Sequence, residues 1–417
     1  MQILRWAIRL FIGAIVILIM TSCTMLGLNY ASLEVDNKQS PYPPFPDPFD
    51  KALAKSTLEA ELYGPWPENL PISKGESRVV DSNYLEGRGT LEEIMITIGN
   101  GDGARTFPIV VAIPNKAETE PVPLIISQTF SDNCSVFPNS RVSTLNGEIC
   151  DGSRMSGPLG FVATQIFGTY IAKAPVERYF EAGFAYASMP GSGFIPDRNG
   201  TAQQVMQALG QAPLPTSALM GWGFSFHASA DILGGDARMD ETAIIALGHS
   251  RYGKAALVAA AWSDTIKAAI AHQSGFAGGS SSRSKTGETL KRMAKSYPHW
   301  LRPGLADDLE AGKPLTYDQH FLLALSAPKP VFLGNGRRDV WSDPNSSFRI
   351  AQAADTIYKQ SGTVGLTATN MQEFDPAASL AYWLRVGGHS VVSEDIDAFI
   401  AFASAHFIDG EALQTPK

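Results

Sequence analysis

The sequence has few of the residues that build metal, nucleotide or nucleic-acid sites. It holds three cysteines in 417 residues, and its seven histidines lack the spacing of metal ligands. Its 33 basic residues are dispersed among 41 acidic ones, so no basic stripe is available to neutralise phosphates. Glycine clusters at 191–193 and 278–279 lack the context of a phosphate-binding loop. We therefore expect no cofactor, no metal ion and no nucleic-acid partner.

Long apolar runs are also scarce, and the longest lies at the N-terminus. Two arginines precede the run Leu10–Met20, a pattern typical of a secretory signal and short for a membrane span. Small residues then lead to Cys23, which resembles the lipobox of bacterial lipoproteins. We expect a signal peptide over 1–22 and a lipid anchor at Cys23, with a plain signal peptide or an uncleaved anchor as alternatives. Thr24, where aspartate would favour the inner membrane, predicts an exported protein anchored to the cell envelope at the outer membrane.

The remaining two cysteines, Cys134 and Cys150, lie 16 residues apart in a stretch rich in Ser, Asn and Gly. In an exported protein such a pair is readily oxidised, and closing a loop of this size stabilises a fold by roughly 3 kcal/mol. We expect a disulfide, with two buried free thiols as the alternative.

Proline marks the boundary between the N-terminal region and the folded domain. The segment 40–50, "SPYPPFPDPFD", can be neither helix nor central strand. We interpret 23–54 as a linker that holds the folded part of the protein away from the membrane, and 55–417 as one domain.

The chain after the linker predicts an α/β fold. Residues 91–99 and 107–114 are strand-like runs around "NGDGART", which indicates an antiparallel hairpin near the N-terminus. A third, almost wholly apolar strand follows at 122–130, as expected where both faces of a sheet are covered. Beyond residue 180, strands and helices alternate, which predicts a three-layer sandwich around a mostly parallel sheet. The expected strands are 183–190, 241–248, 266–275 and 328–336, and the expected helices are 218–235, 251–262 and 344–360.

Residues 244–262, "IIALGHSRYGKAALVAAAW", predict a catalytic nucleophile and so indicate that 55–417 is a catalytic domain. A strand that ends in Gly-x-Ser and turns at once into a helix is a nucleophile elbow, which projects the serine hydroxyl above the sheet. Ser250 occupies that position, and the helix N-terminus favours an oxyanion there. The fold is therefore expected to be an α/β-hydrolase. The second glycine, however, comes one residue later than in Gly-x-Ser-x-Gly.

That departure carries a resemblance to a known family. The stretch "GHSRYGKAAL" resembles the Gly-x-Ser-Arg-x-Gly-Lys signature of the glucuronoyl esterases, in their bacterial form. These carbohydrate esterases cleave esters between 4-O-methyl-glucuronic acid on xylan and lignin alcohols. The resemblance extends over about residues 80–410, including "GETLKRMAKSYPHWL", "RDVWSDP" and "RVGGHSVVSEDIDAFIAFASAHF".

A serine nucleophile needs an imidazole base and a carboxylate to orient it. His389 lies in a glycine-flanked loop near the C-terminus, where this fold places its base. Asp339 follows the strand at 328–336 and gives the chain order Ser, Asp, His. Asp343 is the alternative acid, although Asp-Pro also begins helices. Many family members carry a glutamate after the preceding strand, but Gln273 stands there, and an amide cannot supply the negative charge.

The resemblance implies roles for further residues. Arg251 would stabilise the oxyanion through its backbone N–H and its guanidinium, with a surface salt bridge as the alternative. Lys254, one helical turn past the serine, would contact the uronate hydroxyls. The remaining implied sugar contacts are Glu288, Trp341, His299 and Trp300.

Together these features predict a serine esterase that acts on glucuronic acid esters of a plant or algal polysaccharide through an acyl-enzyme. One alternative is an esterase for other esters, such as acetylated sugars, because the elbow specifies acyl transfer whereas loops choose the substrate. The other is a degenerate hydrolase that only binds acidic glycans, which Gln273 motivates.

Overall fold

The computed structural model describes residues 42–145, 167–171, 173–210 and 216–409, together with Trp6 and Gly13. The expected signal peptide, Cys23, most of the expected linker and Cys150 lie outside the described residues. Cys134 is disulfide-bonded, and its pairing with Cys150 stays a prediction. Over the described ranges, no helix has the length and apolar character that crossing a bilayer requires.

A single nine-stranded sheet runs through the molecule in the order β1-β2-β3-β5-β4-β6-β7-β8-β9. β1, β2, β3 and β5 pair antiparallel, and β5, β4, β6, β7, β8 and β9 pair parallel. The mostly parallel sheet and its N-terminal antiparallel extension are therefore confirmed. The strands are β1 (Ile72–Asn83), β2 (Gly89–Ile98), β3 (Arg105–Pro114), β4 (Val122–Thr129), β5 (Ala185–Pro190), β6 (Met239–His249), β7 (Ala268–His272), β8 (Val331–Gly336) and β9 (Leu380–Arg385).

The helices begin and end close to where the sequence predicts them. The expected helices 251–262 and 344–360 agree with α8 and α12, and 218–235 agrees with α7 to within one residue. The described helices are α2 (Lys51–Leu58), α3 (Tyr84–Gly87), α5 (Val176–Glu181), α6 (Thr201–Ala208), α7 (Ala218–Gly234), α8 (Arg251–Trp262), α9 (Leu290–Ser296), α10 (Leu305–Glu310), α11 (His320–Ser326), α12 (Pro344–Gln360) and α13 (Ser393–Phe407).

Two strands were not predicted, and their sequences explain why. β1 is exposed along most of its length, so it lacks the alternation of apolar and polar residues that identifies a half-buried strand. It pairs with β2 alone, at the edge of the sheet. β9 is a six-residue strand at the opposite edge.

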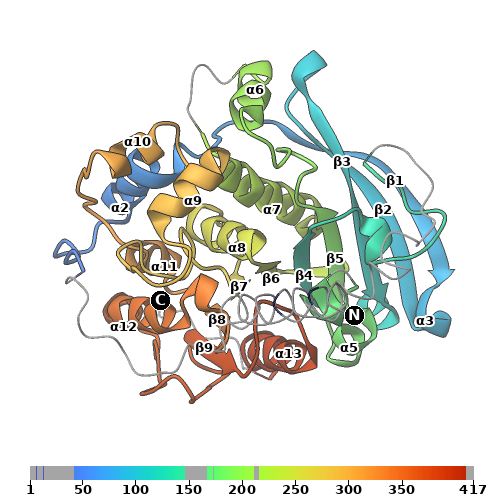
Figure 1. The fold of residues 1–417 in the computed structure, drawn as a ribbon. Coiled ribbons are helices and arrows are strands. Elements are labelled where there is room, and N and C mark those ends of the chain that lie inside the picture. Colours follow the sequence, from blue (N-terminus) through green and yellow to red (C-terminus); the bar gives the residue numbers. More distant parts are fainter. Residues whose placement is uncertain are drawn as a thin grey trace.

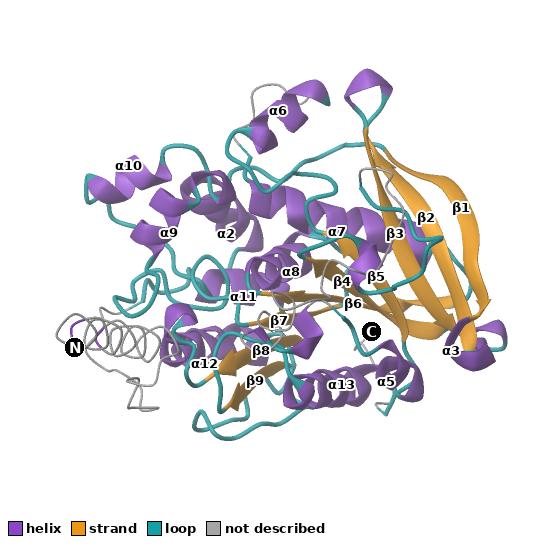
Figure 2. Ribbon diagram, turned by 45° about the vertical axis from the view of Figure 1, so that its right-hand side comes forward, coloured by secondary structure: helices purple, strands orange, loops and turns teal. Residues whose placement is uncertain are grey.

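Helices cover both faces of the sheet, as Figures 1 and 2 show. Along β4, Leu124 and Ile126 belong to a core shared with α7, α8, α11 and α12, whereas Ile125 between them belongs to a core shared with α5 and α13. Successive side chains of a strand point to opposite faces, so one buried strand feeds both cores. The three-layer arrangement is therefore confirmed.

Residues 42–50, expected as linker, pack on the domain instead. The Phe45 ring lies 5.0 Å from Phe321 and 4.7 Å from His320, measured between centroids. His320 Nε2 donates to Pro43 O over 2.9 Å. The prolines do keep this segment out of helices and strands, but the aromatic residues between them bury their rings against α11. The packed domain therefore starts by residue 42 rather than at 55.

Candidate active site

Ser250 lies at the sharp turn between β6 and α8. Its backbone angles, φ 55° and ψ −125°, are strained for a residue with a side chain, as a nucleophile elbow requires. The turn is so tight that a Cβ on Gly248 would lie 2.0 Å from the Tyr252 carbonyl oxygen. The Ser250 N–H donates to His272 O at the end of the neighbouring strand β7, over 2.8 Å.

The position of the usual second glycine of the elbow is filled by Tyr252. Its ring is buried against Trp222 and Phe130, at centroid distances of 5.3 and 5.0 Å. Space for the ring comes from the loop after β5, where a Cβ on Gly191 would lie 2.1 Å from it. In Gly-x-Ser-x-Gly the second glycine itself avoids a collision at the turn. Here the position holds a tyrosine, and Gly191 of another segment leaves the space that its ring needs.

His389 and Asp339 form the hydrogen-bonded pair that the sequence analysis anticipated. His389 Nδ1 lies 2.7 Å from Asp339 Oδ2. Their two loops are joined by the backbone, because Arg338 N donates to Gly387 O over 2.7 Å. Burial alone would raise the pKa of Asp339, but the His389 ring and the Ser342 N–H outweigh it, and the pKa is lowered. Asp339 is thus a buried carboxylate that stays ionised beside an imidazole.

Asp343, the alternative acid, occupies another environment. Its carboxylate accepts the Ser346 N–H as the N-cap of α12 and also contacts the Ser284 hydroxyl. The structure thus places Asp339 next to His389, whereas Asp343 caps the N-terminus of α12.

Behind the base lies a buried chain of polar groups that the sequence analysis missed. The His249 ring is 4.6 Å from the His389 ring, and its Nδ1 is 3.0 Å from His272 Nδ1. His272 Nε2 in turn lies 3.2 Å from Asp395, which Arg385 pairs through Nε. Burial and then the charge of His389 hold the pKa of His249 well below its usual range. His249 therefore stays neutral and adds no positive charge behind the base.

Gln273 is buried at the end of β7, and its side chain contacts the backbone of the His389 loop. Nε2 donates to Gly388 O, and Oε1 accepts from the Ser390 N–H, each over 2.9 Å. The amide thus brackets His389 on both sides.

Arg251 extends from the elbow into an aromatic pocket. Its guanidinium carbon lies 4.8 Å from the Phe130 ring centroid and 5.7 Å from that of Trp300. Its Nε lies 3.1 Å from Asp197 Oδ2. The arginine therefore has the ion pair that the alternative interpretation expected, but the pair lies beside the nucleophile.

Asp197 also joins two of the expected sugar contacts. His299 Nε2 and Trp300 Nε1 lie 2.8 and 2.7 Å from its Oδ1. Trp300 is buried, and its ring stacks on the half-exposed Tyr297 at 4.1 Å. His299 and Trp300 thus hold the carboxylate that pairs with Arg251. Of the two stacked rings, Tyr297 is the one exposed to solvent.

Lys254 points into the domain from the first turn of α8. The side chain is buried, and Nζ donates to Ser274 O and to Phe276 O, the latter over 2.7 Å. Burial lowers the pKa of this amine to about 8. Two of its three protons serve the loop after β7, which leaves one for a ligand.

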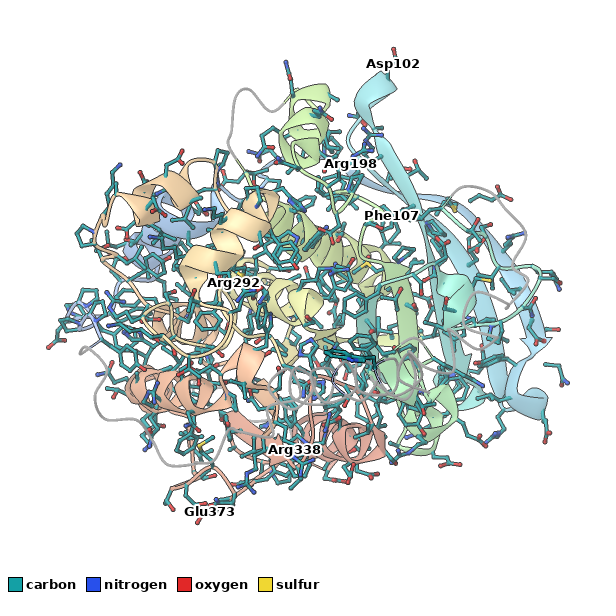
Figure 3. The ribbon with its side chains drawn as sticks, in the orientation of Figure 1. Asp102, Phe107, Arg198, Arg292, Arg338 and Glu373 are labelled. Carbon is teal, nitrogen blue, oxygen red and sulfur yellow. The ribbon has the colours of Figure 1, made fainter. Side chains whose placement is uncertain are left out.

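Glu288 and Trp341 lie close together near Lys254. Glu288 N donates to Trp341 O over 3.0 Å, and the exposed Trp341 ring is covered by Arg292 of α9 at 4.7 Å (Figure 3 labels Arg292). Burial raises the pKa of Glu288, and Lys254 opposes that shift. An indole beside a buried carboxyl is an arrangement that suits a sugar ring with hydroxyl groups.

Asp197, His272 and Asp395 carry no signal in the sequence that would have singled them out. Asp197 lies in the loop "FIPDRNG" and Asp395 in the first turn of an ordinary amphipathic helix. Only the register of β6 against β7, which pairs His249 with His272, brings the two histidines together.

A model of a known protein family matches part of the chain. The model described as fungal glucuronyl esterase matches residues 199–362, a segment that contains Ser250, Lys254, Glu288 and Asp339. His389 lies beyond the matched segment.

Two curated relatives have related descriptions. "Carbohydrate esterase MZ0003", from an unknown prokaryotic organism, is 26% identical over 366 residues, which cover 85% of this chain and 83% of that protein. A 4-O-methyl-glucuronoyl methylesterase of Phanerochaete carnosa is 24% identical over 254 residues, which cover 58% of this chain and 63% of that protein.

Solved structures share the fold. A promiscuous CE15 esterase from a marine bacterial metagenome aligns with a TM-score of 0.75 at 23% identity, covering 91% of this chain and 99% of that one. A glucuronoyl esterase from Solibacter usitatus aligns with a TM-score of 0.71 at 23% identity, covering 89% and 99%. The expected resemblance and the α/β-hydrolase fold are thereby confirmed.

Proposed function

We propose that this chain, which resembles the glucuronoyl esterases, hydrolyses esters of glucuronic acid on a polysaccharide by serine catalysis. The observation that carries the proposal is the His389–Asp339 pair of 2.7 Å, in a chain whose strained Ser250 stands at a nucleophile elbow. The family match supports the uronate ester as the substrate class.

In the proposed mechanism, His389 Nε2 takes the proton of the Ser250 hydroxyl as Oγ attacks the ester carbonyl. Asp339 accepts the Nδ1–H of His389, fixes its tautomer and stabilises the imidazolium. The C–O bond to the alcohol then breaks, and the alcohol leaves with the proton from His389. Water, activated by the same imidazole, releases the uronic acid and restores Ser250.

The negative charge that develops on the carbonyl oxygen needs donors in place before the reaction. The backbone N–H of Arg251 at the N-terminus of α8 supplies one, and the guanidinium adds positive charge nearby. Asp197 and Phe130 restrict the movement of that guanidinium. In this proposal Glu288 and Trp341 contact the sugar, and Lys254 uses its remaining proton for a ring hydroxyl.

The proposal is tested by hydrolysis of an aryl-alkyl ester of glucuronic acid, measured beside an acetylated sugar. We expect the wild-type protein to cleave the uronate ester, and Ser250→Ala to lose the activity while remaining folded by circular dichroism. Cleavage that persists in Ser250→Ala would contradict the mechanism.

One observation favours a second candidate, an esterase for other sugar esters. Lys254, implied as a uronate contact, already donates to two backbone carbonyls, so little of its charge is open to a ligand. Cleavage of the acetylated sugar alone would support this candidate. Failure on both esters, with retained binding of acidic glycans, would support a degenerate hydrolase.

We also propose an exported enzyme that Cys23 anchors to the cell envelope through a lipid. The N-terminal pattern of arginines, apolar residues and cysteine supports it. Replacing Cys23 by alanine should move the protein from the membrane fraction to the soluble fraction, and an unchanged distribution would contradict the anchor.

A further inference from the structure

We infer that Gln273 is a positioning residue for the catalytic base, and that its amide is required where a carboxylate would fail. The inference rests on the proposed function, because it assigns His389 as the base. The resemblance pointed to this position as the place of a missing acid, and the contacts of Gln273 give it a different task.

The two backbone groups that Gln273 contacts differ in hydrogen-bonding character. The Gly388 carbonyl can only accept, and the Ser390 N–H can only donate, so the side chain between them must donate at one end and accept at the other. Glutamine does both, over 2.9 Å at each contact. An ionised glutamate would keep the bond to Ser390 but place a negative oxygen against the Gly388 carbonyl.

The two hydrogen bonds of Gln273 flank His389 along the chain. They attach to the residues immediately before and after His389, so they restrict the backbone that carries the imidazole. Arg385 supports the same loop from β9, with Nη2 donating to Ser390 O over 2.6 Å. Asp339 fixes the imidazole ring itself through Nδ1. Gln273 and Arg385 therefore hold the backbone around His389, and Asp339 holds its side chain.

Gly336 leaves space for the amide of Gln273. A Cβ on Gly336, at the end of β8, would lie 2.6 Å from Gln273 Nε2 and 2.8 Å from the carbonyl oxygens of Gly387 and Gly388. The absence of a side chain at 336 lets the glutamine reach across β8 to the loop. Gln273 itself adopts φ 48°, a conformation that an L residue holds only when its surroundings fix it.

A displacement of the base by a fraction of an ångström slows proton transfer strongly, so the loss appears in turnover. For Gln273→Glu we expect kcat at pH 8 to fall about 10- to 100-fold with little change in KM. Protonation of the new carboxyl restores a donor toward Gly388 O. The ratio of variant to wild-type activity should therefore rise as pH falls from 8 to 5.

The charged and titratable groups around position 273 are Asp339 after β8, His389, Arg385 of β9, His272 of β7, His249 of β6 beside both imidazoles and, behind Arg385, Asp395 of α13. An ionised carboxylate at 273 raises the pKa of His389. Each profile is therefore fitted with its own pKa for His389 before the two activities are divided.

Two further variants separate positioning from packing. Gln273→Met keeps the length without either hydrogen bond, and we expect a loss of activity that does not depend on pH. Gln203→Glu is the matched control, because Gln203 on α6 also donates an amide N–H to a carbonyl, Thr216 O over 3.0 Å, away from the base. This control should keep the wild-type pH profile.

The readout is the rate at which a fluorophosphonate labels Ser250, together with ester turnover per labelled site. Labelling needs the base but no particular ester, so it tests the inference even if the substrate proposal fails. The inference would be overturned if Gln273→Glu were labelled as fast as wild type. It would also be overturned if the ratio of the variant's labelling rate to the wild-type rate did not change with pH. Recovery of Asp339→Asn by Gln273→Glu would also overturn it, since the new carboxylate would then be serving as the acid. A wild-type protein that does not label would overturn both proposals.

Discussion

At the scale of single residues, Asp339 and Asp343 offer a matched pair of carboxylates four positions apart. Asp339→Asn should lower kcat by about 10⁴-fold, because the amide cannot stabilise the imidazolium and favours the wrong tautomer of His389. Asp343→Asn should stay within a few-fold of wild type, because asparagine caps helices well and tolerates the left-handed φ of 49° at this position. Steady-state measurement of kcat for both variants decides which aspartate is the catalytic acid. A large loss in Asp343→Asn with a small one in Asp339→Asn would assign the acid to Asp343.

Lys254 gives a prediction for stability against pH. Its pKa is lowered to about 8 in the fold by burial, while the unfolded chain has the ordinary value of 10.5. Between these values the unfolded state binds more protons, so the free energy of unfolding rises with pH by up to about 1.4 kcal/mol per unit from this group. Below pH 8 the group contributes no slope.

The test compares wild type with Lys254→Met in urea unfolding from pH 7 to 10. The difference in unfolding free energy between the two proteins should grow above pH 8 in favour of wild type. Parallel curves across the range would show that the amine titrates normally in the fold.

Residues near one another in the sequence were predictable, and residues joined only by the fold were not. Ser250 follows from a local motif, Asp339 from its place after a predicted strand, and His389 from its glycine-flanked loop near the C-terminus. Asp197 reaches Arg251 from the loop after β5, more than fifty residues away, and nothing in its own neighbourhood marks it. Gln273 was noticed only as a lost charge, because sequence gives residue type without hydrogen-bond partners.

At the scale of elements, the nucleophile elbow depends on Gly248. Gly248→Ala would place a Cβ 2.0 Å from the Tyr252 carbonyl oxygen, a contact that only movement of the strand or helix can relieve. We expect loss of activity and a drop of several kcal/mol in unfolding free energy. Thermal and urea unfolding, with the labelling of Ser250, measure both effects.

Gly235 at the end of α7 is the control for the elbow. Its φ of −76° suits any residue, and a Cβ there would meet only ordinary contacts at 3.6 Å. Gly235→Ala should leave activity and stability nearly unchanged. Equal effects at the two sites would mean that the elbow has more freedom than its geometry indicates.

At the scale of the whole molecule, the N-terminal arm is part of the domain. Compared with a protein that begins at residue 42, one that begins at Lys51 loses Tyr42, Phe45 and Phe49 from the surface of α11. The three rings are only partly buried, so together they correspond to the burial of one large apolar side chain. Such burial adds roughly 1.5–3 kcal/mol to the free energy of unfolding, so we expect this truncation to lower the melting temperature by several degrees.

Melting curves of the two proteins, measured under one condition, give the result directly. An unchanged melting temperature for the shorter protein would restore the linker interpretation. Proline content predicts extended backbone but carries no information about whether the aromatic residues between the prolines find a surface, so this contact could not be expected from composition.

The ring of Tyr252 and the missing side chain of Gly191 meet across two distant segments, and this links their evolutionary histories. A lineage that replaced the tyrosine by a small residue would empty the space against β5 and release position 191 to acquire a side chain. A lineage that kept the tyrosine could not tolerate one. The two positions should therefore change together among relatives, and exchanging only one of them between proteins should be more damaging than exchanging both.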